Sequence, residues 1–190
     1  FGGSGHADVL DRLAERDVRM LRGNHEELYL DRPAHIHKMP RENWEYIRRF
    51  HDYLDVHLSA EHLQLLAGLP LKIEIPINDR QVLQVCHATP ADPWLYVCNP
   101  HTTVDELEHG FGSSEADLIA HGHWHWHHMI KFREKHLINV ASVGERQDGL
   151  SSLTVLDTRP GGWSIRQLQV PYNTVEEDRL MRVRSTPRPD

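Results

Sequence analysis

The chain has 190 residues, a formal net charge of −7 and 39% hydrophobic residues, which fits one globular domain of ordinary size. This acidic balance leaves no basic footprint for general nucleic-acid binding. No apolar run approaches the length that crosses a membrane and no signal peptide opens the sequence, so a cytoplasmic protein with no membrane partner is expected. Two cysteines are too few for a disulfide framework, and Cys86 is expected to be a buried structural thiol.

Helices are predicted in the first part of the chain. Apolar residues recur at helical spacing over residues 7–16 and 42–54, so each segment is expected to bury one stripe. Ser59 is expected to cap a third helix, which Pro70 ends.

Between these helices, residues 18–21 predict a short strand that leads into a polar loop at residues 23–26. Residues 31–37 are expected to be irregular. A helix followed by a strand that ends in such a loop indicates an α/β arrangement.

Strands are predicted after Pro70. Alternation of apolar and other residues over residues 71–77 is typical of a half-buried strand. Further strands are predicted over residues 81–86, 117–120, 129–132, 137–140, 153–157 and 163–170. Thr103 is expected to cap a short helix, and residues 159–162 are expected to join the last two strands as a hairpin.

This order of elements predicts a layered α/β sandwich of sheets flanked by helices. We expect one domain over residues 1–172, followed by a tail at residues 173–190. The end of that tail, residues 182–190, is charged and rich in proline and is expected to be disordered.

Residues 120–128 hold five histidines in nine positions. Histidine is the commonest metal ligand among side chains. Alternate side chains of an extended segment share one face, so the side chains of His121, His123, His125 and His127 could all lie on the same face. Gly122 indicates that a strand breaks into a loop here. A solvated, histidine-rich surface loop is the alternative interpretation.

Three polar loops each follow a predicted strand: residues 23–26, His87, and residues 122–125. Active sites of α/β proteins gather at strand ends. Imidazoles with one amide oxygen suit Mn²⁺, Fe²⁺, Ni²⁺ or Zn²⁺, and the set lacks the thiolates of a structural zinc site. His121, His127 and His128 are expected to be surface residues rather than ligands.

Four stretches taken together carry a family resemblance. They are Gly23-Asn24-His25-Glu26, the lone His87, Gly122-His123-x-His125, and residues 139–144, which are similar to an Asn-x-Gly-Ser-x-Gly motif. In this order they resemble calcineurin-like metallophosphoesterases of the bacterial phosphodiesterase branch, over positions 1 to 172. The resemblance implies a four-layer α/β/β/α sandwich with a centre of two divalent metal ions.

The resemblance also implies a role for each matching residue. Asn24, His87 and His123 would bind one metal, and His125 would bind the other. His25 would act as the general acid that protonates the leaving oxygen, and Glu26 would orient it. The chemistry implied is attack of a metal-bridging hydroxide on phosphorus.

The sequence departs from the family pattern between the two histidines of the last loop. Trp124 stands where the family has a small hydroxyl residue. Its indole, with Trp94 and Tyr96, could stack on a substrate base, or these aromatic rings could simply cover the sheet edge.

A larger departure concerns the front of the chain, where the family's Asp-x-His and Gly-Asp motifs are absent and Phe1–Gly5 resembles the loop after them. The N-terminal strands of the sandwich are therefore expected to be missing from this chain. As written, the chain is expected to bind at most one ion tightly.

The sequence therefore predicts a metal-dependent phosphoesterase that hydrolyses a phosphodiester or nucleotide. Homo-oligomer formation stays open. One alternative is a non-catalytic divalent-metal-binding or scaffold protein derived from this fold, and another is a histidine-rich metal buffer. Sequence upstream of Phe1 would distinguish the phosphoesterase from the non-catalytic protein. The histidine-rich metal buffer is tested by whether Asn24 and His87 lie close to His123.

Overall fold

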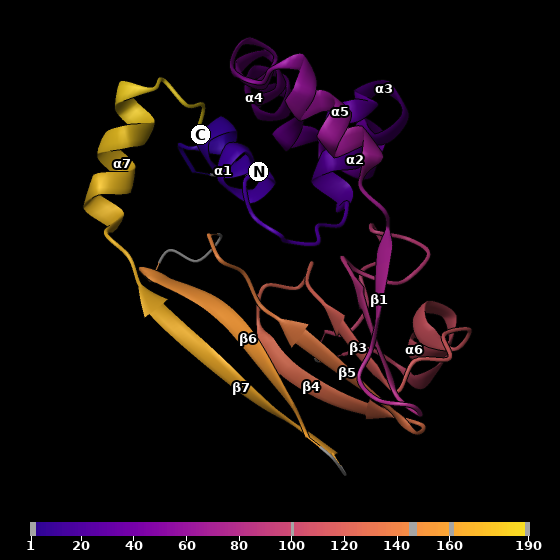
Figure 1. Cartoon of the computed structure of the whole chain (residues 1–190). Coiled ribbons are helices and arrows are strands. Elements are labelled where there is room, and N and C mark those ends of the chain that lie inside the picture. Colours follow the sequence, from indigo (N-terminus) through magenta and orange to yellow (C-terminus); the bar gives the residue numbers. More distant parts are fainter. Residues whose placement is uncertain (1–2, 100, 145–147, 160–161, 189–190) are drawn as a thin grey trace. The chain divides into compact units, whose positions relative to one another are not determined.

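The computed structural model describes residues 3–99, 101–144, 148–159 and 162–188. The chain divides into two compact units, whose parts are labelled in Figure 1. The helical unit comprises Phe1–Met20, Asn24–Leu69 and Asn173–Asp190, and the sheet unit comprises Leu21–Gly23 and Pro70–Tyr172. Within the described ranges, no helix combines the length and the apolar character needed to cross a membrane.

The helical unit contains six α-helices and two short 3₁₀ turns among its described residues. These are α1 (His6–Ala14), α2 (Asn24–Leu30), α3 (Arg32–His35), η1 (Ile36–Lys38), η2 (Arg41–Asn43), α4 (Trp44–His57), α5 (Ala60–Gly68) and α7 (Thr174–Val183). The three helices predicted for the first 70 residues are confirmed as α1, α4 and α5. Ser59 caps α5 as predicted, because its side chain accepts a hydrogen bond from the His62 amide.

The core of the helical unit forms along one face of α4. Phe50 and Leu54, four residues apart, are 3% and 0% exposed, as expected for positions one turn apart on a helix. They pack with Leu58 and with Leu66 of α5. The apolar periodicity therefore identified a buried face in α4. The buried stripe expected for residues 7–16 is wrong, because no residue of α1 is buried and Val9 is 53% exposed.

Two predictions for the helical part of the chain are wrong. Residues 18–21 are not a strand, since none of the described strands pairs with them and a strand needs a neighbour for its backbone groups. Residues 31–37 are not irregular, because they form α3 and most of η1. The Asp31 side chain accepts a hydrogen bond from the Ala34 amide, and Pro33 lies in the first turn, where proline is tolerated.

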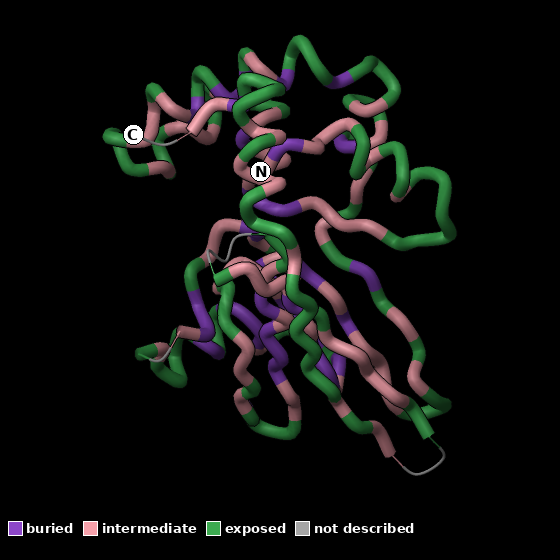
Figure 2. The backbone as a smooth tube through the Cα atoms, turned by 90° about the vertical axis from the view of Figure 1, so that its left-hand side faces the viewer, coloured by how far each residue is buried: buried purple, intermediate pink, exposed green. Residues whose placement is uncertain are grey.

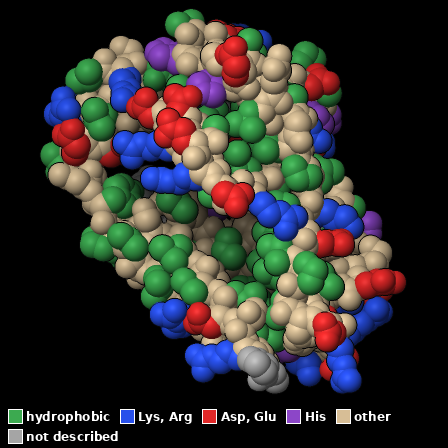
Figure 3. All heavy atoms as spheres, viewed as in Figure 1, with side chains coloured by type: hydrophobic (Ala, Val, Ile, Leu, Met, Phe, Trp, Pro, Cys, Tyr) green, Lys and Arg blue, Asp and Glu red, His purple; other side chains and the backbone are tan. Residues whose placement is uncertain are grey.

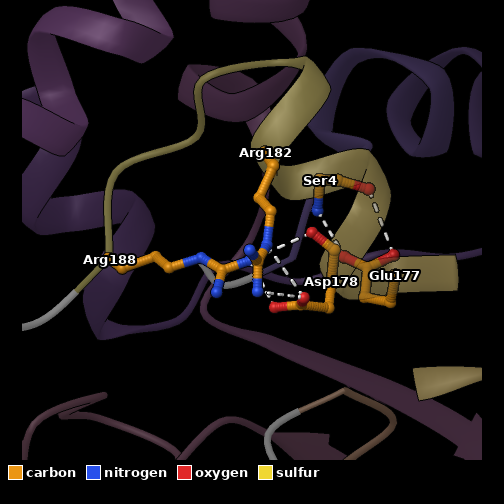
Figure 4. A network of polar contacts seen from close by, with 5 residues as sticks. All are labelled: Ser4, Glu177, Asp178, Arg182 and Arg188. Carbon is orange, nitrogen blue, oxygen red and sulfur yellow. Dashed lines mark hydrogen bonds and ion pairs between the residues drawn. The ribbon is translucent and has the colours of Figure 1, made fainter. Parts of the chain in front are cut away.

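The prediction of disorder at the end of the chain is also wrong for the residues that the structure describes there. Residues 182 and 183 belong to α7, and Arg188 forms an ion pair with Asp178 of that helix at 2.6 Å. Arg182 shares the same carboxylate, and Glu177 accepts hydrogen bonds from Ser4 (Figure 4). Thr186 is 6% exposed. Residues 189 and 190 lie outside the described ranges.

The sheet unit contains a five-stranded sheet, a two-stranded sheet and one helix among its described residues. The elements are β1 (Lys72–Pro76), β2 (Val82–Cys86), α6 (Val104–Phe111), β3 (Leu118–His121), β4 (His127–Phe132), β5 (Lys135–Val140), β6 (Leu150–Arg159) and β7 (Gly162–Pro171). Every strand predicted after Pro70 is present, and Thr103 caps α6 through a capping box with Glu106. Residues 160 and 161 of the predicted hairpin turn lie outside the described ranges.

The larger sheet has the strand order β1-β2-β3-β5-β4, and β6 and β7 form the antiparallel pair. Strands β2, β3 and β5 are parallel, and β1 and β4 run antiparallel at the two edges. Buried positions concentrate along the central strands (Figure 2). Phe111 of α6 packs there with Ile119 and Leu137, so the core lies between the helix and the sheet.

The register of the sheet aligns one row of side chains at the ends of the parallel strands. Cys86 of β2 is opposite His121 of β3, His121 is opposite Asn139 of β5, and Asn139 is opposite His128 of β4. Side chains opposite one another in a sheet share a face. The row therefore carries two histidines, a thiol and an amide at the edge where β2 and β3 pass into their loops.

Candidate metal centre

The sheet unit brings two of the predicted ligands into contact. His87 directly follows β2, and His123 lies two residues beyond β3. The Nε2 atom of His87 is 3.1 Å from the Nδ1 atom of His123, and the ring centroids are 5.0 Å apart. Two nitrogens that each bind one ion at 2.0–2.1 Å, at tetrahedral or octahedral angles, lie about 2.9–3.4 Å apart. This spacing therefore fits two ligands of one ion.

The electrostatics of these side chains favour the metal-binding form of imidazole. Burial, followed by the charges of His123 and His125, lowers the pKa of His87 to about 3. Burial and the charge of His125 also lower the pKa of His123, while Asp92 opposes that change. Neutral imidazole is the form that binds metals. We call His87, His123 and His125 the imidazole cluster.

The backbone after β3 turns sharply rather than running on as a strand. The Gly122 amide donates to the His87 carbonyl at 2.7 Å, and the Trp124 amide donates to the Gly122 carbonyl at 2.6 Å. His123 has a φ of 60°, which is unusual outside glycine. The predicted break after the strand is confirmed. The expectation that His121, His123, His125 and His127 share a face is wrong, because β3 ends at His121 and β4 begins at His127.

Asn139 supports this turn from the neighbouring strand. Its side chain is fully buried, and its Nδ2 atom donates to the Gly122 carbonyl at 2.7 Å and lies 3.3 Å from Nδ1 of His121. Its Oδ1 atom accepts from the Ala141 amide at 2.8 Å. Ala141, with a φ of 62°, occupies the place where the similar family motif has glycine.

Two aromatic residues flank the imidazole cluster. Tyr96 is 55% exposed, and its ring is 5.6 Å from that of His123 and 4.7 Å from that of Trp124, edge to face in both cases. The residue that departs from the family pattern therefore lies against the tyrosine of the preceding loop. Trp94 lies in the same loop, where its amide donates to the Asp92 side chain.

The three remaining predicted site residues belong to the helical unit. Asn24 is the first residue of α2 and is 7% exposed, and His25 and Glu26 follow it in the first turn. The prediction of a loop at these residues is wrong, because they begin a helix. A carboxylate in a first turn interacts favourably with the helix dipole. Their roles as ligand, acid and orienting group stay predictions.

A second group of donor atoms in the sheet unit was not predicted from the sequence. One ligand atom from each of Cys98, His121 and His128 lies within 4.8 Å of the other two. The expectation that His121 is a surface residue is wrong, because it is 2% exposed at the buried end of β3. A histidine that closes the apolar run Leu118–His121 was the signal available. The sequence contained no comparable signal for Cys98.

A comparison with protein-family models gives no match to the sequence, and a comparison with curated proteins gives none either. Solved structures do match. A metallophosphoesterase from Sphaerobacter thermophilus aligns over 97% of this chain and 80% of its own, with a TM-score of 0.73 and 20% identity. The hypothetical protein PH1004 from Pyrococcus horikoshii OT3 aligns over 95% of this chain and 73% of its own, with a TM-score of 0.71 and 14% identity.

These similarities concern the fold. The mixed sheet with its helices has the calcineurin-like metallophosphoesterase fold, and the expected α/β class is confirmed.

Proposed function

We propose that this chain is a metal-dependent phosphoesterase that hydrolyses a phosphodiester or a nucleotide. The observation that carries the proposal is the pair of ring nitrogens from His87 and His123, 3.1 Å apart at the ends of two parallel strands. In α/β proteins such strand ends are where active sites form. The metallophosphoesterase fold supports the same chemistry by analogy.

The donor set defines the metals that fit. His87 and His123, together with Asn24, would hold one divalent ion, and His125 would contribute to a second. Imidazole with amide oxygen suits Mn²⁺, Fe²⁺, Ni²⁺ or Zn²⁺. When bound, such ions lower the pKa of water and neutralise the charge that develops on the phosphoryl group.

The other residues of the proposed site position the substrate and move a proton. His25 would protonate the leaving oxygen, and Glu26 would hold its ring in place. Tyr96 and Trp124 offer ring faces beside the imidazole cluster, and stacking on a base contributes about 1–3 kcal/mol.

Surface charge supports a small phosphate ester rather than a long nucleic acid. The chain has 21 basic and 28 acidic residues. On the face shown in Figure 3, side chains of both signs lie among one another instead of forming a basic stripe. Nucleic-acid binding typically relies on such a stripe.

A chromogenic phosphodiester assay with added Mn²⁺, beside metal analysis, tests the proposal. His87→Ala and His123→Ala should each reduce bound metal and turnover, while His109→Ala, at an exposed position of α6, should change neither. Bound metal without turnover would favour the alternative, a non-catalytic metal-binding or scaffold protein. Unchanged metal binding in both variants would contradict the proposed centre.

A further inference from the structure

Cys98, His121 and His128 form a compact donor group in the sheet unit, which we call the cysteine–histidine cluster. One donor atom from each lies within 4.8 Å of the others. Cys98 is 0% exposed, His121 is 2% exposed, and His128 is partly buried. The three residues come from the loop before α6, the end of β3 and the start of β4.

Both histidines of this cluster have a buried ring nitrogen that lacks a hydrogen-bond partner. Among the described residues, nothing donates to or accepts from Nε2 of His121 or Nε2 of His128. Leaving a buried polar atom unpaired costs about 1–3 kcal/mol, and such atoms are uncommon in folded proteins. A metal ion held by the two rings would supply such a partner.

The Nδ1 atoms, in contrast, are engaged and orient the rings. Nδ1 of His128 lies 3.1 Å from the Trp126 carbonyl, which can only accept, so Nδ1 carries the proton of the neutral ring. The Cys98 backbone also interacts with this ring and raises its pKa, whereas burial, the larger effect, lowers it. In His121, a hydrogen bond to the Gly122 carbonyl favours a protonated ring. Nδ1 is the ring nitrogen of His121 with a hydrogen-bond partner, since it lies 3.3 Å from Nδ2 of Asn139. A proton fixed on the far nitrogen is the usual arrangement of a metal-binding histidine.

The backbone at Cys98 is held in an uncommon conformation. Its φ is 64°, and among the described non-glycine residues with positive φ it is joined by His123 and Ala141 of the same region. A left-handed residue of this kind costs about 1–2 kcal/mol, and such strain tends to collect at functional sites. The fold therefore presents this thiol at a cost in stability.

We propose that Cys98, His121 and His128 bind a borderline transition-metal ion of the Zn²⁺ type, at a site separate from the imidazole cluster. Bonds of about 2.3 Å to sulfur and 2.0–2.1 Å to nitrogen place tetrahedral ligands about 3.3–3.7 Å apart. The donor atoms, at 4.8 Å or less from one another, have to approach by no more than about 1–1.5 Å to reach this spacing. Three protein ligands leave one position for water. The ion ties the loop that carries Cys98 and Tyr96 to the ends of β3 and β4.

Proton balance is part of this assignment. Burial raises the pKa of the Cys98 thiol to about 12, so the sulfur is protonated when no ion is bound. An ion that binds there takes the thiolate and releases one proton to solvent. Two neutral imidazoles and one thiolate then leave a single net positive charge on a divalent site.

Cobalt binding to the full chain tests the proposal, because Co²⁺ bound by a thiolate gives a sulfur-to-metal charge-transfer absorption that imidazole ligands cannot give. We expect the band in the wild-type chain, in His123→Ala and in Cys86→Ser. We expect Cys98→Ser to lose it. Cys86 is the matched control, since it is a thiol 2% exposed whose Sγ atom instead donates to the Ala88 carbonyl.

The wild-type measurement keeps the test decisive even if a variant folds poorly. A wild-type chain that binds Co²⁺ without a charge-transfer band would overturn the proposal. So would a band lost in Cys86→Ser and retained in Cys98→Ser. Thermal unfolding adds a second reading: Zn²⁺ at about 100 times its dissociation constant should raise Tm by about 5–10 °C in His123→Ala, which keeps only the cysteine–histidine cluster, and not in the double variant His123→Ala/Cys98→Ser.

Discussion

The imidazole cluster and the cysteine–histidine cluster are separated by one residue along β3 and its loop, yet they differ in exposure and in donor chemistry. His125 of the imidazole cluster is exposed, whereas Cys98 and His121 are almost fully buried. The imidazole cluster offers only nitrogen ligands, and the cysteine–histidine cluster offers nitrogen and sulfur. The exposed nitrogen site is accessible to a substrate, whereas the site with sulfur is almost fully buried and leaves its fourth position to water.

The origin of this difference is the end of β3. His121 still belongs to the sheet and takes its direction from the register with Asn139, so its ring points into the core. His123 lies beyond the turn with a positive φ, so its ring meets His87 instead. A single glycine between them is enough to send neighbouring histidines to two environments.

The largest expected effect separates catalysis from ligation within the proposed active site. His25→Ala should lower turnover of a phosphodiester by about 10²–10⁴-fold, the usual contribution of a general acid, and leave bound metal unchanged. His123→Ala should lower both. Cys98→Ser should leave turnover nearly unchanged when the protein is folded and the added metal saturates the imidazole cluster. Parallel assays and metal analysis check this, and metal loss in His25→Ala would make that residue a ligand.

Asn139 is the residue whose loss should damage both clusters. Asn139→Ala removes the bonds to Gly122, His121 and Ala141 and leaves buried groups unpaired, which should lower the free energy of unfolding by about 2–4 kcal/mol. Urea denaturation measures this. Gln169→Ala, which removes an exposed amide from β7, should change stability by less than about 0.5 kcal/mol. Equal effects of the two variants would show that Asn139 does not hold the turn.

Removal of metal should distinguish the two clusters by rate. With Zn²⁺ bound, excess EDTA should take the ion from the exposed imidazole cluster at least about tenfold faster than from the buried one, because a chelator reaches a buried ion only after local opening. Stopped-flow release followed with a zinc indicator should show two phases. His123→Ala should lose the fast phase and Cys98→Ser the slow one. A single phase in the wild type would contradict two sites of different exposure.

The smallest expected effect concerns the backbone between the clusters. Ala141→Gly should raise the free energy of unfolding by up to about 1 kcal/mol, because the left-handed conformation costs alanine about 1–2 kcal/mol and glycine loses part of that gain through its freer unfolded state. Ala120→Gly, in β3, where φ is not positive, should instead destabilise. Denaturant titration of the two variants compares them directly.

The sequence predicted the elements whose signal is local. Apolar periodicity located α4 and β1, and capping residues located the starts of α5 and α6, because each pattern is written within a few neighbouring residues. The predictions that failed concern segments whose structure depends on residues far away in the sequence. Residues 18–21 have the composition of a strand but no strand in the described ranges to pair with, and Arg188 is ordered by Asp178 of α7.

The same distinction between local and distant signals separates the two candidate metal sites. His87 and His123 were predicted from short motifs next to strand ends, and their contact follows from the parallel pairing of β2 and β3. Cys98 is 23 residues before His121 and 30 before His128, with no recurrent spacing to connect them. Only the strand register and the loop before α6 bring these donors together, so sequence patterns could not have identified this set.

The Asn139 amide has a thermodynamic consequence for the two proposed sites. It contacts His121 of one cluster and, through the Gly122 carbonyl, the turn that presents His123 of the other. In the two proposed sites, an ion that moved the ring of His121 would therefore also shift the turn at Gly122, so the two ions would be energetically coupled. Such coupling is reciprocal: whatever factor the buried ion applies to the affinity of the outer ion, the outer ion applies to the buried one. The cell's supply of a zinc-type metal would then set how readily the outer site fills, without that metal ever meeting the substrate.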